Sequence, residues 1–327
     1  MIGNIIAEWV KLDALILGGG GFFADDVSRK NVIKWSAYIL IFRLLRIRVY
    51  GYCLGVGPLN HLSSRILARI AFGSMNGIVV RDEVSRDWLV NAGCRKEIIV
   101  SADPVFNFKL DAPDVGKILE AEQVPLDRPY VVISIPPFFH DSERWPGQYE
   151  KWVRYCKSWA ELVEYVIELG VTPLFLPMQH CPVGYKLFSD IDCAELIASM
   201  TKSKDDVHIL RGELTPGQVA SVLGGSALVI AMRLHAVILA LVSGTAVSGA
   251  VYHHKVEAVV KSLGLEKYFI DVNEIDADNL KKAVESAWND RIKIKDMVQN
   301  KLPEHRNRII EAQKYVTNSL RSLVRLC

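Results

Sequence analysis

Residues 227–252, ALVIAMRLHAVILALVSGTAVSGAVY, decide the fold: a long apolar run is interrupted by Arg233 and His235. Its pattern predicts a buried strand, a helix and a second strand. The expected ranges are Ala227–Ala231, Leu234–Val242 and Ala246–Tyr252. Arginine keeps its charge, and burying it unpaired costs several kcal/mol. Either a carboxylate therefore pairs with Arg233, or the turn lines a site for an anion; a charge in mid-run disfavours a membrane span.

The rest of the chain shows the same alternation of strands and helices. Further strands are expected at Asp13–Leu17, Ile47–Cys53, Gly77–Val80, Glu97–Val100, Tyr130–Ile135, Thr172–Leu176, Val207–Leu210 and Tyr268–Val272. Helices are expected at Lys30–Leu45, Ser63–Phe72, Val84–Ala92, Tyr149–Leu169, Gly184–Met200, Thr215–Leu223 and Val256–Leu263, and on to the C-terminus. This order predicts an α/β protein with two doubly wound, Rossmann-like domains facing a cleft, and sites at the carboxyl ends of the strands.

Composition changes mark the expected domain boundaries. We expect an N-terminal domain over residues 1–110 and a Pro- and Asp-rich linker with a short helix over 111–128. A C-terminal domain should follow over 129–295, and a helical segment over 296–327 should pack back on the N-terminal domain.

Charge and cysteine usage limit the class of protein. A net charge of +2 over 327 residues argues against a nucleic-acid-binding surface. Met1–Val10 does not resemble a signal peptide. The six cysteines include no C-x-x-C pair, so thiols in a reducing cytoplasm are favoured over zinc or disulfides. We expect no metal, because the adjacent His253 and His254 point apart.

Several candidate site residues follow the expected strands. They are Gly19 and Gly20, Arg81 and Asp82, Asp103, Arg233 with Leu234 and His235, and Lys255. The helix start after Arg233 favours anion binding through free amides and the helix dipole. Alternatives stay open: the glycines form a tight turn, Arg81 pairs with Asp82 or Glu83 at the surface, and Lys255 lies in solvent. Asp103 either orients Arg81 or begins a turn.

In this order and spacing, the motifs resemble the polysaccharide pyruvyl transferase family. They are LGGGGFF, GVGP, VRDE, SADPVF, LPMQ, AMRLHAVILA and YHHKVE, and the R-L-H segment followed by a lysine is the most specific. The resemblance implies a GT-B-like fold and transfer of a pyruvyl group from phosphoenolpyruvate to a sugar of a cell-surface polysaccharide or its precursor. It implies a cytoplasmic protein whose co-substrate is phosphoenolpyruvate, with no other cofactor.

The resemblance also assigns roles by motif. Arg81, Arg233, Leu234 and Lys255 would bind phosphoenolpyruvate, and His235 would act with Arg233 in catalysis. Phosphoenolpyruvate carries a phosphate and a carboxylate, so fixed cations suit it. Histidine is the natural proton donor, because imidazole titrates near neutral pH. Family members open with a G-x-x-N-x-G-D-E unit and a further βα unit, so we expect the first domain to lack these opening units.

Two alternatives to a pyruvyl transferase remain. One is a GT-B glycosyltransferase that binds a nucleotide sugar, and the other is a non-catalytic sugar- or anion-binding protein. Two basic and apolar segments, residues 29–48 and the C-terminal helix with Arg321 and Arg325, also suit the inner face of a membrane that carries a lipid-linked saccharide acceptor. A core-packed helix with a solvated basic edge is the commoner explanation of such segments, and membrane contact is the minor alternative.

Overall fold

The computed structural model describes residues 9, 11–21, 23–26, 28–110, 113–140, 147–179 and 188–324, with side chains to residue 321. The chain divides into two compact units, each described here by itself. The first unit comprises Met1–Asn107 and Pro303–Cys327, and the second comprises Phe108–Leu302.

The first unit is built on a four-stranded parallel sheet in the order β1-β2-β3-β4. The strands are β1 (Ala14–Gly18), β2 (Arg48–Leu54), β3 (Gly77–Val80) and β4 (Ile99–Val100). They are joined by α2 (Arg29–Leu44), α3 (Leu62–Ser74) and α4 (Glu83–Asn91). Because the strand order follows the chain order, right-handed crossovers place these three helices on one face of the sheet.

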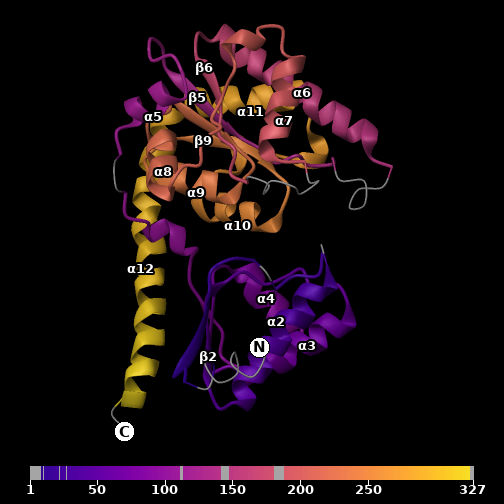
Figure 1. The fold of residues 1–327 in the computed structure, drawn as a ribbon, viewed down its shortest axis with the longest axis vertical. Helices are drawn as coiled ribbons and strands as arrows, with labels where there is room; N and C mark the ends of the chain where they lie inside the picture. Colours follow the sequence, from indigo (N-terminus) through magenta and orange to yellow (C-terminus); the bar gives the residue numbers. More distant parts are fainter. Residues whose placement is uncertain are drawn as a thin grey trace. The chain divides into compact units, whose positions relative to one another are not determined.

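The second half of α12 (Arg291–Val324) covers the other face of this sheet (Figure 1). Ala312 and Val316 pack against Tyr50, Cys53 and Val79, and partly buried Leu320 joins them. Tyr50 Oη and Ser319 Oγ lie 2.8 Å apart. Arg325, noted in the sequence for its charge, lies outside the described residues.

The second unit is built on a six-stranded parallel sheet in the order β10-β9-β8-β5-β6-β7. The strands are β5 (Tyr130–Ser134), β6 (Thr172–Phe175), β7 (His208–Ile209), β8 (Leu228–Ala231), β9 (Val247–Val251) and β10 (Phe269–Asp271). The helices are α5 (Val115–Ala121), α6 (Tyr149–Glu168), α7 (Asp190–Met200), α8 (Pro216–Gly224), α9 (Leu234–Val242), α10 (His254–Leu263) and α11 (Ala277–Asn289). The order β9-β8-β5 brings the ends of three strands to one edge, where the chain carries Arg233.

Residues 113–128 differ from the expected linker, because they belong to the second unit. Within them α5 buries Ile118 and Leu119, and it lies against α8. A short helix with two buried apolar residues is part of a core and not a free connection. The start of the expected linker, residues 111 and 112, lies outside the described residues.

Helix starts account for the other differences. The helix expected from Gly184 begins at Asp190, because Ser189 and Asp192 form a capping box there; residues 184–187 lie outside the described residues. The helix expected from Val256 begins at His254, because His253 Nδ1 accepts the amide of Lys255 at 3.3 Å. Lys255 therefore lies in the first turn of α10.

Over the described ranges, no helix is both long and apolar enough to cross a membrane. The apolar run at residues 227–252 instead forms β8, α9 and β9.

Candidate functional site

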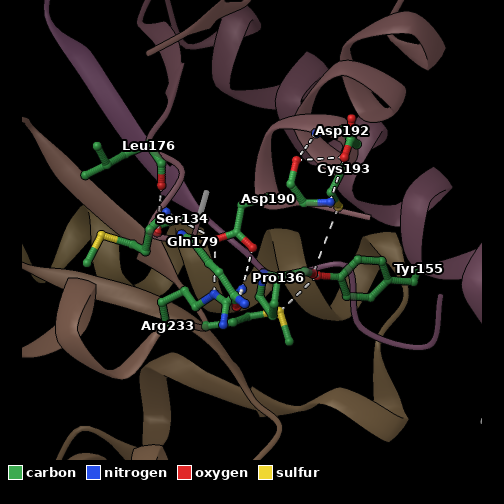
Figure 2. Close-up of polar contacts among 12 residues, drawn as sticks. Ser134, Pro136, Tyr155, Leu176, Gln179, Asp190, Asp192, Cys193 and Arg233 are labelled. Atoms are coloured by element: carbon green, nitrogen blue, oxygen red, sulfur yellow. Dashed lines mark hydrogen bonds and ion pairs between the residues drawn. The ribbon is translucent and has the colours of Figure 1, made fainter. Parts of the chain in front are cut away.

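Arg233 lies at the carboxyl edge of the second unit's sheet, between β8 and α9, where it is the N-cap residue. Its side chain is 20% exposed, and Asp190 holds it in place (Figure 2). Arg233 Nε donates to Asp190 Oδ2 at 3.1 Å, and Nη2 donates to Asp190 Oδ1. Nη2 also donates to Gln179 Oε1 at 3.0 Å. The carboxylate alternative raised by the sequence is thus present, and the Arg233 side chain stays partly exposed.

Asp190 is itself buried, at 2% exposure, at the first position of α7. Its Oδ2 accepts the backbone amides of Met178 and Gln179, each at 3.1 Å. These amides follow β6, so one carboxylate joins the end of β6 to the arginine after β8. A buried ion pair needs such additional hydrogen bonds to offset the desolvation of both charges.

The remaining N–H groups of Arg233 lie on Nη1, which has no hydrogen-bond partner among the described residues. Burial lowers the pKa of Arg233. Asp190 and the neighbouring Tyr252 and Tyr155 raise it by more than burial lowers it, so the pKa lies above its ordinary value. The guanidinium is therefore a permanent cation whose Nη1 is not used by the described residues.

The backbone beside Arg233 is fixed by close packing. Gly249 of β9 lies where a Cβ would be 2.0 Å from the carbonyl oxygen of Ala231, so only glycine lets β9 approach the end of β8. Tyr155 Oη lies 2.7 Å from the Pro136 carbonyl oxygen and 3.2 Å from Met232 Sδ (Figure 2). Burial raises the pKa of Tyr155, so its hydroxyl stays neutral.

His235 is exposed in the first turn of α9, and it makes no side-chain hydrogen bond among the described residues. Leu234, half-buried, precedes it at the first helical position. The amides of both residues belong to the first turn, whose N–H groups have no partner within the helix. This turn therefore presents backbone donors, Arg233 and an accessible imidazole together.

Lys255 lies at the same edge, because α10 follows β9, the neighbour of β8. A small cavity of about 150 Å³ opens next to it, lined by residues that include Tyr252, His253 and Glu257. The ring centroids of His253 and His254 lie 4.1 Å apart, so the expectation that these two side chains point apart is wrong. Within the described ranges, no cluster of three or more His, Cys, Asp or Glu side chains is arranged to hold a metal.

In the first unit, Arg81 follows β3 and is buried, with only 4% of its side chain exposed. Nη1 donates to Asp103 Oδ2 at 2.8 Å, and Nε lies 3.4 Å from Asp82 Oδ2. Asp82 also caps α4, and Asp103 also accepts the amide of Val105. Arg81 therefore pairs with Asp82, as one alternative expected, but in the interior and not at the surface.

The guanidinium of Arg81 lies against the backbone of Gly55. A Cβ at Gly55 would be 2.9 Å from Nε and 3.0 Å from Nη2. Nη2 is buried and has no hydrogen-bond partner among the described residues. An unsatisfied buried donor is costly, and in native proteins it calls for a specific explanation.

Gly19 and Gly20 have positive φ angles of 47° and 79°, which favour glycine. The carbonyl of Gly20 accepts the amide of Gly55 at 2.9 Å. The two glycines therefore form a bend directly after β1, but not the tight strand-to-helix turn that one interpretation expected, because α2 begins only at Arg29. The bend supports the loop that packs on Arg81.

Four of the cysteines, Cys53, Cys94, Cys156 and Cys193, are buried free thiols. Burial raises the pKa of Cys53, near Arg81, to about 11 and that of Cys156 to about 12. Neutral buried thiols are poor nucleophiles, so these residues are structural. Cys181 and Cys327 lie outside the described residues.

Several solved structures have similar folds. UDP-N-acetylglucosamine 2-epimerase from Neisseria meningitidis matches with a TM-score of 0.61 and 13% identity, over 95% of this chain and 80% of that one. The S. aureus MnaA–UDP structure matches with a TM-score of 0.57 and 12% identity, over 97% and 82% of the two chains. The trehalose-phosphate synthase of Burkholderia xenovorans matches with a TM-score of 0.59 and 8% identity, over 98% and 75%. The predicted GT-B-like α/β class is confirmed; at these identities the likeness shows the fold alone.

The family follows from the sequence match. The model of the polysaccharide pyruvyl transferase family matches residues 3–254, and the chain belongs to this family. The match includes Arg81, Arg233 and His235, and Lys255 lies one residue beyond it. The amylovoran biosynthesis protein AmsJ of Erwinia amylovora is 26% identical over 271 residues, which are 81% of this chain and 63% of AmsJ. The chain therefore spans less than two thirds of that relative.

Proposed function

We propose that this protein transfers the pyruvyl group of phosphoenolpyruvate to a sugar of a cell-surface polysaccharide or its precursor, forming a pyruvate ketal. The observation that carries the proposal is Arg233, oriented by Asp190, with Nη1 left for a ligand. Membership of the pyruvyl transferase family and the AmsJ relative support a role in making an exopolysaccharide of the cell envelope.

The proposed ligand has two anionic groups, and the second unit offers donors for them. Nη1 of Arg233 and the first-turn amides at Leu234 would bind one oxyanion, and Lys255 adds a point charge at the same edge. The family resemblance assigns Arg81 of the first unit to phosphoenolpyruvate binding, and its Nη2, which has no hydrogen-bond partner among the described residues, is consistent with anion binding.

The chemistry then needs a proton donor, which we assign to His235. Its imidazolium gives a proton to the methylene carbon of phosphoenolpyruvate, which becomes a methyl group and leaves a cationic carbon at C2. A sugar hydroxyl adds to that carbon and its proton returns to the imidazole. A second hydroxyl of the same sugar displaces phosphate, its proton leaves with the phosphate, and the ketal closes. Fixed cations stabilise the departing phosphate.

The experiment that tests this function measures phosphate release from phosphoenolpyruvate with a panel of saccharide acceptors, and detects the ketal by mass spectrometry. Acceptor-dependent phosphate release with a pyruvylated product is expected. Parallel reactions with UDP-N-acetylglucosamine in place of phosphoenolpyruvate test the glycosyltransferase alternative. Turnover of the nucleotide sugar without turnover of phosphoenolpyruvate would overturn the proposal, and tight sugar binding without any product would favour a binding protein.

A further inference from the structure

The first unit carries a long basic segment without acidic residues. Residues 27–81 contain nine Lys and Arg residues and no Asp or Glu, although the whole chain has a net charge of only +2. Six of these cations are exposed: Arg29, Lys30, Lys34, Arg46, Arg65 and Arg69. The segment includes all of α2 and α3, so the positive charge is concentrated on one pair of helices.

The outer side of α2 also exposes large apolar residues. Ile33, Ile41 and Leu44 are 55%, 40% and 83% exposed. Their spacing places them along one side of the helix, opposite Val32 and Ile39, which are buried in the core. Lys30 and Lys34 flank this side, because residues three and four apart are neighbours on a helix.

The outer side of α3 repeats the pattern. Leu62, Ile66 and Ile70 follow one another at four-residue intervals and are 73%, 49% and 50% exposed. The buried residues Ala68 and Phe72 lie on the opposite side of the helix. Arg65 and Arg69, both exposed, lie next to the apolar row.

The two rows belong to one surface, because α2 and α3 pack side by side on the same face of the sheet (Figure 1). The inner side of each helix packs on the sheet, and α12 packs on the opposite face of the same sheet. We call the six residues Ile33, Ile41, Leu44, Leu62, Ile66 and Ile70, with the cations around them, the α2–α3 face. Single exposed apolar residues are normal on a protein surface, but six on two neighbouring helices form a patch of the kind that marks an interaction site.

We propose that the α2–α3 face docks on an anionic lipid membrane. Helices with an apolar row bordered by Lys and Arg bind in the interface plane, where the apolar side chains enter the acyl boundary and the cations meet lipid phosphates. A nucleic acid would meet the cations but gain nothing from six leucines and isoleucines. The proposal does not depend on the reaction catalysed, and it needs no helix that crosses the bilayer.

Flotation of the full chain with vesicles tests the docking. Vesicles of phosphatidylglycerol and phosphatidylcholine should carry the protein at about 50 mM salt, and vesicles of phosphatidylcholine alone should carry about tenfold less. Raising the salt to about 500 mM should weaken the binding, because charges outside the bilayer are screened.

Two triple variants separate the contributions. Ile33→Ser, Ile66→Ser and Ile70→Ser remove apolar side chains, and Lys30→Gln, Lys34→Gln and Arg69→Gln remove charges. Each set should reduce vesicle binding about tenfold or more. The matched control combines Ile292→Ser, Lys293→Gln and Lys295→Gln at the start of α12 in the second unit, where Ile292 is 77% exposed. The control should bind as the unmodified chain does.

Three results would overturn the proposal. The first is that the unmodified chain does not float with anionic vesicles at low salt. The second is that the control and both triple variants float equally well. The third is that light scattering shows a dimer, which the serine substitutions convert to a monomer without changing vesicle binding; the face would then be an interface between two copies of the chain. Circular dichroism melting of each variant shows whether it is folded, and the charge variant remains informative if the serine variant unfolds.

Discussion

Asp190 holds Arg233 across 43 residues of sequence, through Nε and Nη2 of the same guanidinium. The same carboxylate accepts two backbone amides after β6. The arginine proposed to bind phosphoenolpyruvate therefore takes its orientation from a residue on α7. The Arg81–Asp103 pair repeats this relationship at the carboxyl edge of the first unit's sheet.

Replacing Asp190 should weaken phosphoenolpyruvate binding without removing the proton donor. For Asp190→Asn, which keeps the shape and loses the charge, we expect KM for phosphoenolpyruvate to rise about tenfold, while kcat changes less. Asp190→Ala leaves a largely buried cation unpaired and should cost about 3–5 kcal/mol of stability. Steady-state kinetics and urea unfolding measure the two effects.

Asp192→Asn is the matched control for Asp190, because Asp192 caps the same helix and is not bonded to Arg233. It should lower stability by about 1 kcal/mol and leave KM unchanged. If KM for phosphoenolpyruvate rose equally in Asp190→Asn and Asp192→Asn, the effect would come from destabilising α7 and not from the lost contact with Arg233.

His235→Gln should strongly slow phosphate release and preserve phosphoenolpyruvate binding. The amide side chain cannot supply the proton, but Arg233 and the first-turn amides remain in place. Loss of general acid catalysis should slow turnover by about 100-fold or more. Calorimetry of phosphoenolpyruvate binding and the phosphate-release assay are the two measurements, with exposed His61→Gln as the control. Near-normal turnover of His235→Gln would remove this residue from the mechanism.

Gly55→Ala tests whether Arg81 must keep its position. The new Cβ would lie 2.9–3.0 Å from guanidinium atoms that Asp103 already holds, so the side chain has to move. We expect a loss of about 1–3 kcal/mol in stability from overpacking, and weaker phosphoenolpyruvate binding. Gly18→Ala, where a Cβ meets nothing within 4 Å, is the control. Unchanged binding by a folded Gly55→Ala protein would argue against a role for Arg81.

Asp25 should make the first unit sensitive to acid. Burial raises its pKa, but the amides of Asn60 and His61, at 2.9 and 3.0 Å, together lower it below the ordinary value of 3.8. Because the folded pKa is depressed, the unfolded chain binds the proton more readily. The stabilisation is complete above pH 3.8 and is lost as the pH falls through 3.8 to the lower folded value.

For Asp25→Asn we expect a loss of about 1–3 kcal/mol at neutral pH, because one of the two amides loses its acceptor. The difference between the unmodified chain and the variant should shrink as the pH is lowered past 3.8. Urea unfolding at a series of pH values measures this. A difference that is constant with pH would contradict the lowered pKa.

The sequence predicted the strands and helices because their patterns are local. The apolar segments of the run at residues 227–252 have the lengths typical of a strand, a helix and a strand. The structure confirms them as β8, α9 and β9 in that order. The helix expected at Thr215–Leu223 is confirmed as α8, which Thr215 caps, because capping chemistry is contained in a few adjacent residues.

The partners of the two arginines were less predictable. Asp103 was considered for Arg81 because both follow strands, but Asp190 follows no strand, and only Ser189 and Asp192 mark the helix start beside it. Nothing local connects that helix with Arg233. Gly249 was missed for a similar reason: its importance lies in the distance to Ala231 on the neighbouring strand, and a single sequence contains no such distance.

The sheet of the first unit receives its covering helix from the end of the chain. Ala312 and Val316 cover the sheet face formed by Tyr50 and Val79. In the sequence, the whole second unit lies between the strands of this sheet and the helix that covers them. During synthesis the second unit can therefore complete its core before the first one does, although the first one leaves the ribosome earlier. Until residues 303–324 emerge, the strands made first have an apolar face that water or a chaperone must cover.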